Sequence, residues 1–285
     1  MLLKRILVIA LFLLASGCET ADEAERQPQL PGTGTAMQQW RLPDALREIS
    51  GLALTPDGRL LAVADEKAVI YELNYVDGKL VRAFAFEEPP LRGDFEGIAW
   101  LNDRVYLATS DGILYSAPAG ADGEHVEAAR TDTGLGTLCE IEGLAENTRY
   151  DRLYLVCKER RDEGDPEDLR IFEWSVGEQK TTRSIAVPVA GIRRQLGGDG
   201  FHPSGLVLNR ANGHFLVVAA RERGLAELDS DGLLIEARLL ADAGRHRQPE
   251  GIELTSSGKL LLADEGGEGK ARLAVYEVWK DGVSR

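Results

Sequence analysis

Acidic side chains recur at fixed positions before a repeated glycine, and they are the residues of this sequence best placed to do chemistry. A dipeptide of Gly followed by Leu or Ile recurs in front of a strongly apolar run at five places, where its glycines are 46, 46, 62 and 46 residues apart. These glycines are Gly51, Gly97, Gly143, Gly205 and Gly251. The residues one place before them are Ser50, Glu96, Glu142, Ser204 and Glu250, and those three places before are Glu48, Asp94, Glu140, His202 and Gln248. Six of these ten residues are acidic, whereas 47 acidic residues in a chain of 285 predict between one and two.

The acidic enrichment indicates a cation site if the repeats surround one axis. Alternate residues of a strand share a face, so both sets are expected to point the same way. Carboxylates gathered at one place repel each other unless something neutralises them, and oxygen-rich clusters suit calcium. We therefore predict Glu96, Glu142 and Glu250 as metal ligands and the other seven positions as channel-lining. Two alternatives stay open, namely that the carboxylates bind backbone N–H groups of neighbouring units or pair with Lys158 and Arg221.

Other catalytic signals are weak. His202 is the one histidine at a repeat position, and a lone histidine is usually a hydrogen-bonded structural residue. Ser50 and Ser204 have no nucleophile-elbow context, and the chain has no Cys/His zinc spacing and no phosphate loop. A metal-dependent hydrolase would use a channel metal as its Lewis acid, with His202 or a spare carboxylate as general base.

The elements that must position these residues are short strands. Each repeat contains a turn after its first apolar run, such as Pro56-Asp57-Gly58, followed by further apolar runs, and four short strands per unit favour a propeller blade. We predict an all-β fold, a single propeller of five blades with four antiparallel strands each, and six blades as the alternative. The fifth unit lacks an outer strand, which residues 38–42 supply to close the ring. The longer spacing is assigned to loop insertions at 160–169 and 190–201.

The chain begins with the features of a lipoprotein signal. Lys4 and Arg5 precede a short apolar run, and small residues lead directly into Cys18. We predict a signal peptide over 1–17, a lipidated Cys18 with a flexible tether over 18–37, and the propeller over 38–285. Acyl chains such as palmitate on Cys18 would anchor the protein to a membrane. Glu19 favours the outer membrane facing the periplasm, with the inner or plasma membrane as the alternative.

The net charge limits the kinds of partner to be expected, and two further cysteines could form a disulfide. Loss of residues 1–17 removes two basic and no acidic residues from a chain of net charge -14, so nucleic acid is not expected as a partner. A monomer is expected. Cys139 and Cys157 either pair in an oxidising compartment or remain two small buried thiols.

The repeat sequences resemble a known family. Glu48-Ile49-Ser50-Gly51-Leu52, Asp94-Phe95-Glu96-Gly97-Ile98 and Pro249-Glu250-Gly251-Ile252 are similar to the SdiA-regulated (YjiK-like) propeller family, as are Ala64-Asp65-Glu66 and Ala263-Asp264-Glu265. The resemblance spans about Trp40 to Trp279 and implies the propeller fold, but it implies no chemistry. Related propellers, including gluconolactonase-like enzymes and phytase-type esterases, sometimes hold a central metal. The fourth unit departs from the pattern, with His202-Pro203-Ser204-Gly205 and Ala220-Arg221-Glu222.

These observations predict a membrane-anchored envelope lipoprotein that binds a ligand or protein partner over its central channel face, with calcium as the candidate ion. The alternative is a metal-dependent hydrolase of a phosphoester or lactone.

Overall fold

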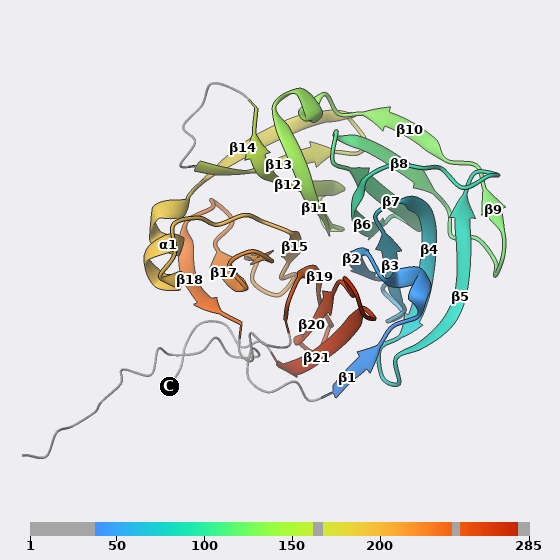
Figure 1. The fold of residues 1–285 in the computed structure, drawn as a ribbon. Coiled ribbons are helices and arrows are strands. Elements are labelled where there is room, and N and C mark those ends of the chain that lie inside the picture. Colours follow the sequence, from blue (N-terminus) through green and yellow to red (C-terminus); the bar gives the residue numbers. More distant parts are fainter. Residues whose placement is uncertain (1–37, 162–167, 241–245, 279–285) are drawn as a thin grey trace, which may run out of the picture.

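Each glycine-centred repeat folds into one antiparallel sheet, and the five sheets form a ring (Figure 1). The structure is a computed structural model that describes residues 38–161, 168–240 and 246–278. The first two blades contain β2 (Ile49–Leu54), β3 (Leu60–Ala64), β4 (Lys67–Asn74) and β5 (Lys79–Phe86), then β6 (Phe95–Leu101), β7 (Arg104–Thr109), β8 (Ile113–Ala117) and β10 (Ala129–Asp132). The third blade contains β11 (Cys139–Asn147), β12 (Arg152–Arg160), β13 (Asp168–Ser175) and β14 (Lys180–Pro188). The fourth contains β15 (Gly205–Leu208), β16 (Phe215–Ala219), β17 (Gly224–Leu228) and β18 (Leu234–Leu239).

The fifth blade closes the ring with a strand from the start of the domain. It contains β19 (Pro249–Leu254), β20 (Lys259–Asp264), β21 (Arg272–Val278) and β1 (Gln38–Arg41). In the antiparallel pair of β1 and β21, Gln38 lies opposite Val275 and Trp40 opposite Leu273. The indole Nε1 of Trp40 also donates a hydrogen bond of 3.1 Å to the carbonyl of Tyr75 in the first blade. The five-bladed prediction, including its closing strand, is confirmed, and the six-bladed alternative is wrong.

The repeated glycines stand where neighbouring inner strands approach most closely. The inner strands β2, β6, β11, β15 and β19 contact one another in cyclic order around the axis. A Cβ atom on Gly97 would lie 2.6 Å from the backbone nitrogen of Leu144 in the next blade. A Cβ atom on Gly51 would lie 3.1 Å from the backbone nitrogen of Ile98, and one on Gly143 would lie 3.0 Å from that of Leu206. Absence of a side chain at these positions therefore lets the blades meet near the axis.

The core lies between the blades, and it explains why the second strands are nearly uniformly apolar. Leu60, Leu61, Ala62 and Val63 of β3 are completely buried, as are Leu260, Leu261, Leu262 and Ala263 of β20. Sheets that pack on both faces need apolar side chains in both directions, because successive side chains point to opposite faces. The apolar runs of the sequence thus mark strands with a blade on either side.

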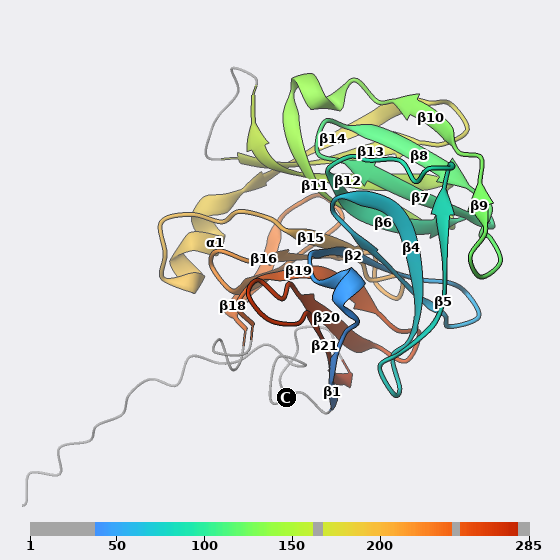
Figure 2. The same cartoon turned by 45° about the vertical axis from the view of Figure 1, so that its right-hand side comes forward.

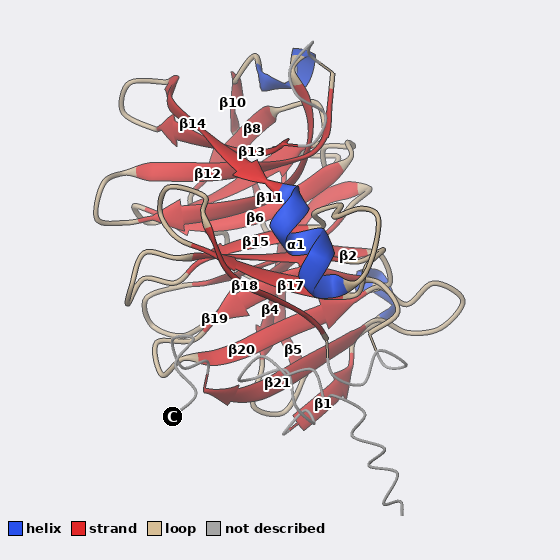
Figure 3. Ribbon diagram, turned by 90° about the vertical axis from the view of Figure 1, so that its left-hand side faces the viewer, coloured by secondary structure: helices blue, strands red, loops and turns tan. Residues whose placement is uncertain are grey.

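The extra residues of the third repeat form a helix where a loop was predicted. The helix α1 (Val189–Leu196) lies on the outside of the ring against β18 (Figures 1 and 3). Val189, Ile192 and Leu196 are buried, and Gly197 ends the helix with a left-handed φ of 73°. The prediction for 190–201 is wrong because three apolar residues at helical spacing were too few to stand out from the strand pattern. Residues 162–167 of the other predicted loop lie outside the described residues.

Smaller elements complete the ring. The short 3-10 helices are η1 (Asp44–Leu46) and η2 (Leu135–Thr137), and β9 (His125–Val126) runs parallel to β5 as a fifth strand of the first sheet (Figure 2). None of the helices in the described part of the chain is long and apolar enough to span a membrane.

Candidate ligand-binding site at the channel mouth

The residue before the repeated glycine lies at a β-bulge in four of the five blades. In the second blade Phe95 pairs with Thr109 and Gly97 with Ala108, so Glu96 has no partner across the ladder. The pairings of the first, third and fifth blades shift in the same place, which leaves Ser50, Glu142 and Glu250 at equivalent irregular positions. A bulge bends its strand and redirects the side chain of the extra residue. The repeat therefore places these side chains at one end of the inner strands, which we call the channel mouth.

Glu96, Glu142 and Glu250 come from three blades and repel one another at this mouth. Burial raises the pKa of Glu96 to about 10, and the neighbouring charges of Glu142, Asp94 and Glu250 add to the effect. Burial likewise raises the pKa of Glu250 to about 9, with further contributions from the charges of Glu265 and Glu142. Burial and like charges both favour the neutral form of a carboxyl group. The structure thus brings together the three residues predicted as metal ligands, in an environment that opposes their ionisation.

A single lysine partly neutralises the cluster. The Nζ atom of Lys158 lies 2.5 Å from Glu142 Oε1 and 3.5 Å from Glu140 Oε1. Burial raises the pKa of Glu142 to about 7, although the hydrogen bond and charge of Lys158 act in the opposite direction. Burial would lower the pKa of Lys158, but its contacts with Glu142 and Glu140 outweigh burial and raise it. Pairing with Lys158, one of the two alternatives for the carboxylates, is therefore present for two of them.

The residues three places before the glycines form an outer rim next to buried Glu142 and half-buried Glu96 and Glu250. Glu48, Asp94 and Gln248 are exposed, and Glu140 is half-buried. In addition to burial, the charge of Asp94 contributes to the raised pKa of Glu96, and the charge of Glu140 contributes to the raised pKa of Glu142. The Asp94 carboxylate also accepts a hydrogen bond of 2.6 Å from the Ser110 hydroxyl. The mouth therefore has two tiers of polar groups, one half-buried to buried and one facing solvent.

The fourth blade contributes a different set of groups. His202 Nδ1 lies 2.6 Å from Glu222 Oε1, and His202 Nε2 lies 3.1 Å from Arg221 Nη1. Because a guanidinium only donates, His202 Nε2 accepts this hydrogen bond and Nδ1 carries the proton given to Glu222. The Ser204 hydroxyl donates to the carbonyl of Pro249 at 2.6 Å and accepts from the backbone N–H of Ala220 at 3.0 Å.

Ser50 differs from its equivalents. Only 4% of the residue is exposed, and its Oγ atom has no hydrogen-bond partner. An unsatisfied buried hydroxyl costs about 1 to 3 kcal/mol. Ser50 is thus a buried oxygen, at the position equivalent to the three glutamates, that a ligand or an ordered water would satisfy.

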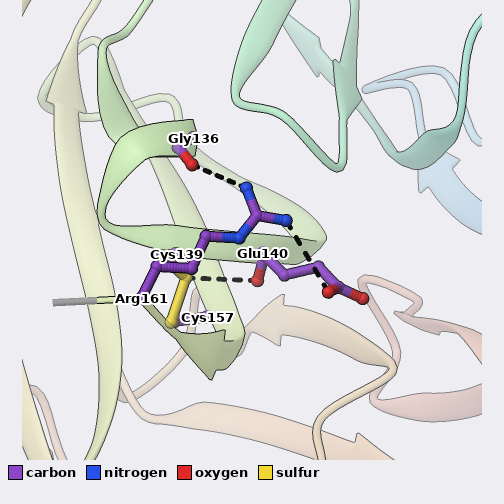
Figure 4. Close-up of a disulfide and its surroundings, with 5 residues drawn as sticks. All are labelled: Gly136, Cys139, Glu140, Cys157 and Arg161. Carbon is purple, nitrogen blue, oxygen red and sulfur yellow. Dashed lines mark hydrogen bonds and ion pairs between the residues drawn. A yellow bond between two sulfur atoms is a disulfide. The ribbon is translucent and has the colours of Figure 1, made fainter.

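A disulfide lies directly beside the lysine that pairs with the glutamates. Cys139 and Cys157 are bonded, with their Cα atoms 5.6 Å apart, and they join β11 to β12 (Figure 4). Arg161 Nη1 donates a hydrogen bond of 2.7 Å to the carbonyl of Gly136, and Arg161 Nη2 lies 3.8 Å from Glu140 Oε2. These contacts hold the end of β12, and therefore Lys158, against β11.

Comparison with known families places the chain. The profile of the SdiA-regulated family matches residues 25–267, which is most of the sequence. The chain belongs to the SdiA-regulated family. The resemblance seen in the repeats is therefore confirmed. A glutaminyl cyclase from Myxococcus xanthus is similar to this SdiA-regulated protein in structure, with 14% identity, a TM-score of 0.59, and coverage of 88% of this chain and 98% of that chain. A luciferin-regenerating enzyme matches with 6% identity, a TM-score of 0.51, and coverage of 81% and 91% respectively. At such identities the likeness concerns the fold alone.

Sequence reasoning missed part of the mouth of this SdiA-regulated protein. Arg223 and Arg247 line a hollow together with Lys158, His202 and Arg221. Two signals were present in the sequence. The fourth repeat replaces the acidic pattern with His202 and Arg221, and Arg247 precedes Gly251 by four residues, as Arg47 precedes Gly51.

The spacing of the carboxylates determines which groups a metal ion could bind. Within 38–161, 168–240 and 246–278, no three His, Cys, Asp or Glu side chains are already spaced to hold a metal ion together. The carboxylates of Glu96, Glu142 and Glu250 fit calcium in chemical type. An ion would have to draw them closer, and the ammonium of Lys158 would have to leave Glu142.

Proposed function

We propose that this SdiA-regulated protein is a binding propeller of the cell envelope, held to a membrane through Cys18, which receives a positively charged ligand at its channel mouth. The observation that carries the proposal is the gathering of Glu96, Glu142 and Glu250, from three blades, in a half-buried to buried place that disfavours their ionised forms unless a positive charge is bound. Calcium is the first candidate for the ligand, because hard divalent cations prefer carboxylate and hydroxyl oxygens. The outer membrane, facing the periplasm, is the proposed location.

A bound cation would reduce the electrostatic repulsion between the carboxylates at the mouth. Each ionised carboxylate at the mouth opposes the others, and Lys158 supplies one positive charge for Glu142 and Glu140. A divalent ion would neutralise two carboxylates at once, and the unpartnered Oγ atom of Ser50 would add a further oxygen. The rim residues above the buried tier would complete the approach path for the ligand.

The hydrogen bonds of His202 and Ser204, two polar side chains of the fourth blade, favour a binding function over hydrolysis. A hydrolase needs a general base whose lone pair faces the substrate. The Nε2 lone pair of His202 accepts a hydrogen bond from Arg221, and the Nδ1–H of His202 donates a hydrogen bond to Glu222. The Ser204 hydroxyl donates to Pro249. His202 and Ser204 thus use these polar groups in hydrogen bonds within the protein, which supports the binding proposal over the metal-dependent hydrolase of a phosphoester or lactone.

Calcium is expected to stabilise the folded protein. A ligand that binds only the native state adds about 2.7 kcal/mol at one hundred times its Kd. For a domain of this size that gain raises the Tm by roughly 5 to 10 °C. The measurement is thermal unfolding of the mature protein, first treated with EDTA, in increasing calcium chloride with magnesium chloride as a parallel series. The calcium-dependent rise should be lost in Glu142→Gln and in Glu250→Gln.

The matched control is Glu127→Gln, which removes the same charge from an exposed residue. This variant should keep the full calcium response. An unchanged Tm of the wild-type protein across the calcium series would contradict the proposal, and so would an equal response in Glu142→Gln.

Membrane attachment through Cys18 has its own test. Cys18 lies outside the described residues, and its proposed role comes from the sequence that precedes it. Replacing Cys18 with alanine removes the thiol that would carry the acyl chains, so the protein should move from the membrane fraction to the soluble fraction or remain unprocessed. The measurement is cell fractionation with mass spectrometry of the mature N-terminus. Membrane association that persists in Cys18→Ala, with no acyl mass on the wild-type N-terminus, contradicts the anchor.

A further inference from the structure

A hollow of about 280 Å³ beside the glutamate cluster has the opposite charge character from the rest of the chain. Its charged lining consists of Lys158, Arg221, Arg223 and Arg247 together with the single carboxyl group of Glu250. The whole chain has 47 acidic and 33 basic residues. Four cationic side chains around one small hollow are therefore a local reversal, which we call the basic hollow.

The basic hollow adjoins a second one of about 470 Å³, since Lys158, His202 and Arg221 line both. The second hollow lies between the third and fourth blades and is also lined by the apolar side chains of Leu169 and Phe201. Pockets of this size hold small organic molecules, and a few convergent polar groups fix their orientation. Charged side chains of both signs, including Glu159, Asp168 and Arg193, also line the second hollow.

Arg221 is held in position by groups that do not neutralise it. Glu222 accepts hydrogen bonds from the backbone N–H of His202 at 3.0 Å and from His202 Nδ1 at 2.6 Å. This fixes the imidazole, whose Nε2 then accepts one hydrogen bond from Arg221 Nη1. A guanidinium has five N–H donors, so most of those on Arg221 remain for another acceptor. Its partner at this contact is a neutral nitrogen rather than a carboxylate.

Arg247 is a second guanidinium without a carboxylate. It is exposed at the rim and makes no hydrogen bond or ion pair with any described residue. Lys158, by contrast, is already paired with Glu142 and Glu140. Arg221 and Arg247 therefore supply the hollow with unpaired positive charge, and their planar forks match the oxygens of carboxylates and phosphates.

We propose that the basic hollow is an oxyanion subsite, in which Arg221 and Arg247 bind a carboxylate or phosphate group of the ligand that enters the channel mouth. The inference deepens the proposed function and rests on it for the choice of the mouth as the binding face. The ligand is then a small organic molecule whose oxyanion lies beside the glutamate cluster, and the positive charge received by the cluster is either a cationic group of the same molecule or a separately bound cation.

The test uses the full mature protein with succinate and inorganic phosphate as separate probes, followed by isothermal titration calorimetry at constant ionic strength. Binding of one probe is expected, and its identity distinguishes a carboxylate from a phosphate source. Arg221→Gln and Arg247→Gln should each weaken that binding about tenfold, the order expected for one charge-assisted hydrogen bond. Arg149→Gln is the matched control, because Arg149 stacks on Tyr150 in the turn between β11 and β12.

Several results would overturn the inference. They are the absence of binding of either probe, an equal loss in Arg149→Gln, and unchanged binding in both arginine variants of the hollow. Each titration is repeated in EDTA and with Glu142→Gln, which separates the two proposals. Oxyanion binding that survives both treatments supports the subsite even if calcium has no effect. Binding that requires calcium and is insensitive to Arg221→Gln and Arg247→Gln assigns the oxyanion to the metal and overturns the subsite. The Tm of each variant verifies that it remains folded.

Discussion

Replacing Gly97 with alanine is expected to lower the free energy of unfolding by about 3 kcal/mol, at the upper end of the usual cost of overpacking. The added Cβ atom would lie 2.6 Å from the backbone nitrogen of Leu144 and 2.7 Å from its Cβ atom. The obstacle is backbone rather than a rotatable side chain, so relief requires two inner strands to separate. For a domain of this size the change corresponds to roughly 6 to 12 °C in Tm.

The measurement is chemical denaturation of the wild-type and variant proteins, with Gly198→Ala as the control. Gly198 is exposed, and a Cβ atom there meets nothing within 4 Å. This variant should leave stability nearly unchanged. Equal stability of Gly97→Ala and the wild-type protein would show that the repeated glycine is not required for the close approach of the blades.

The same glycines explain why the fold was predictable from the sequence. A position that excludes a side chain in every repeat, followed by a buried apolar run, marks the inner strand and the second strand of each blade. Gly51, Gly97 and Gly143 kept their spacing of 46 residues because each performs the same packing task. The missing outer strand after β21 then indicated where β1 had to lie.

The arrangement of the site was harder to predict from the sequence than the fold was, for two physical reasons. Simple strand alternation does not reveal the bulges at Ser50, Glu96, Glu142 and Glu250, because a bulge depends on the pairing of two strands. The basic hollow combines residues from β12, from the turn after β16 and from the segment before β19. The sequence indicated Lys158 and Arg221 as partners for the carboxylates, but Arg223 and Arg247 share no phase of the repeat with them, so the pattern that located the acidic cluster could not locate these two.

The acidic cluster should make stability depend on pH in a direction opposite to that of an ordinary salt-bridged carboxylate. The pKa of Glu96 is raised from 4.5 to about 10 in the folded protein, chiefly by burial and then by the charge of Glu142. Between these values the folded state holds a proton that the unfolded state has lost. The contribution of Glu96 to stability therefore falls as the pH rises above 4.5 and levels off above pH 10.

Glu96→Gln keeps a neutral side chain of similar shape at every pH, so it should remove the part of this dependence that comes from Glu96, while Glu250 and Glu142 keep theirs. At pH 9 in EDTA we expect the variant to exceed the wild-type protein in unfolding free energy by at least about 1.4 kcal/mol, the equivalent of one pKa unit. At pH 4.5 and below the two should differ little, because Glu96 is protonated in the folded protein and at least half protonated in the unfolded chain. The measurement is urea denaturation at pH 4.5, 7 and 9, with the exposed Glu127→Gln as control. If Glu96→Gln is instead less stable than the wild-type protein at pH 9, Glu96 is ionised in the folded protein, which contradicts the prediction. A positive charge then stabilises the ionised form, either a bound cation that EDTA does not remove or Lys158 turned toward Glu96.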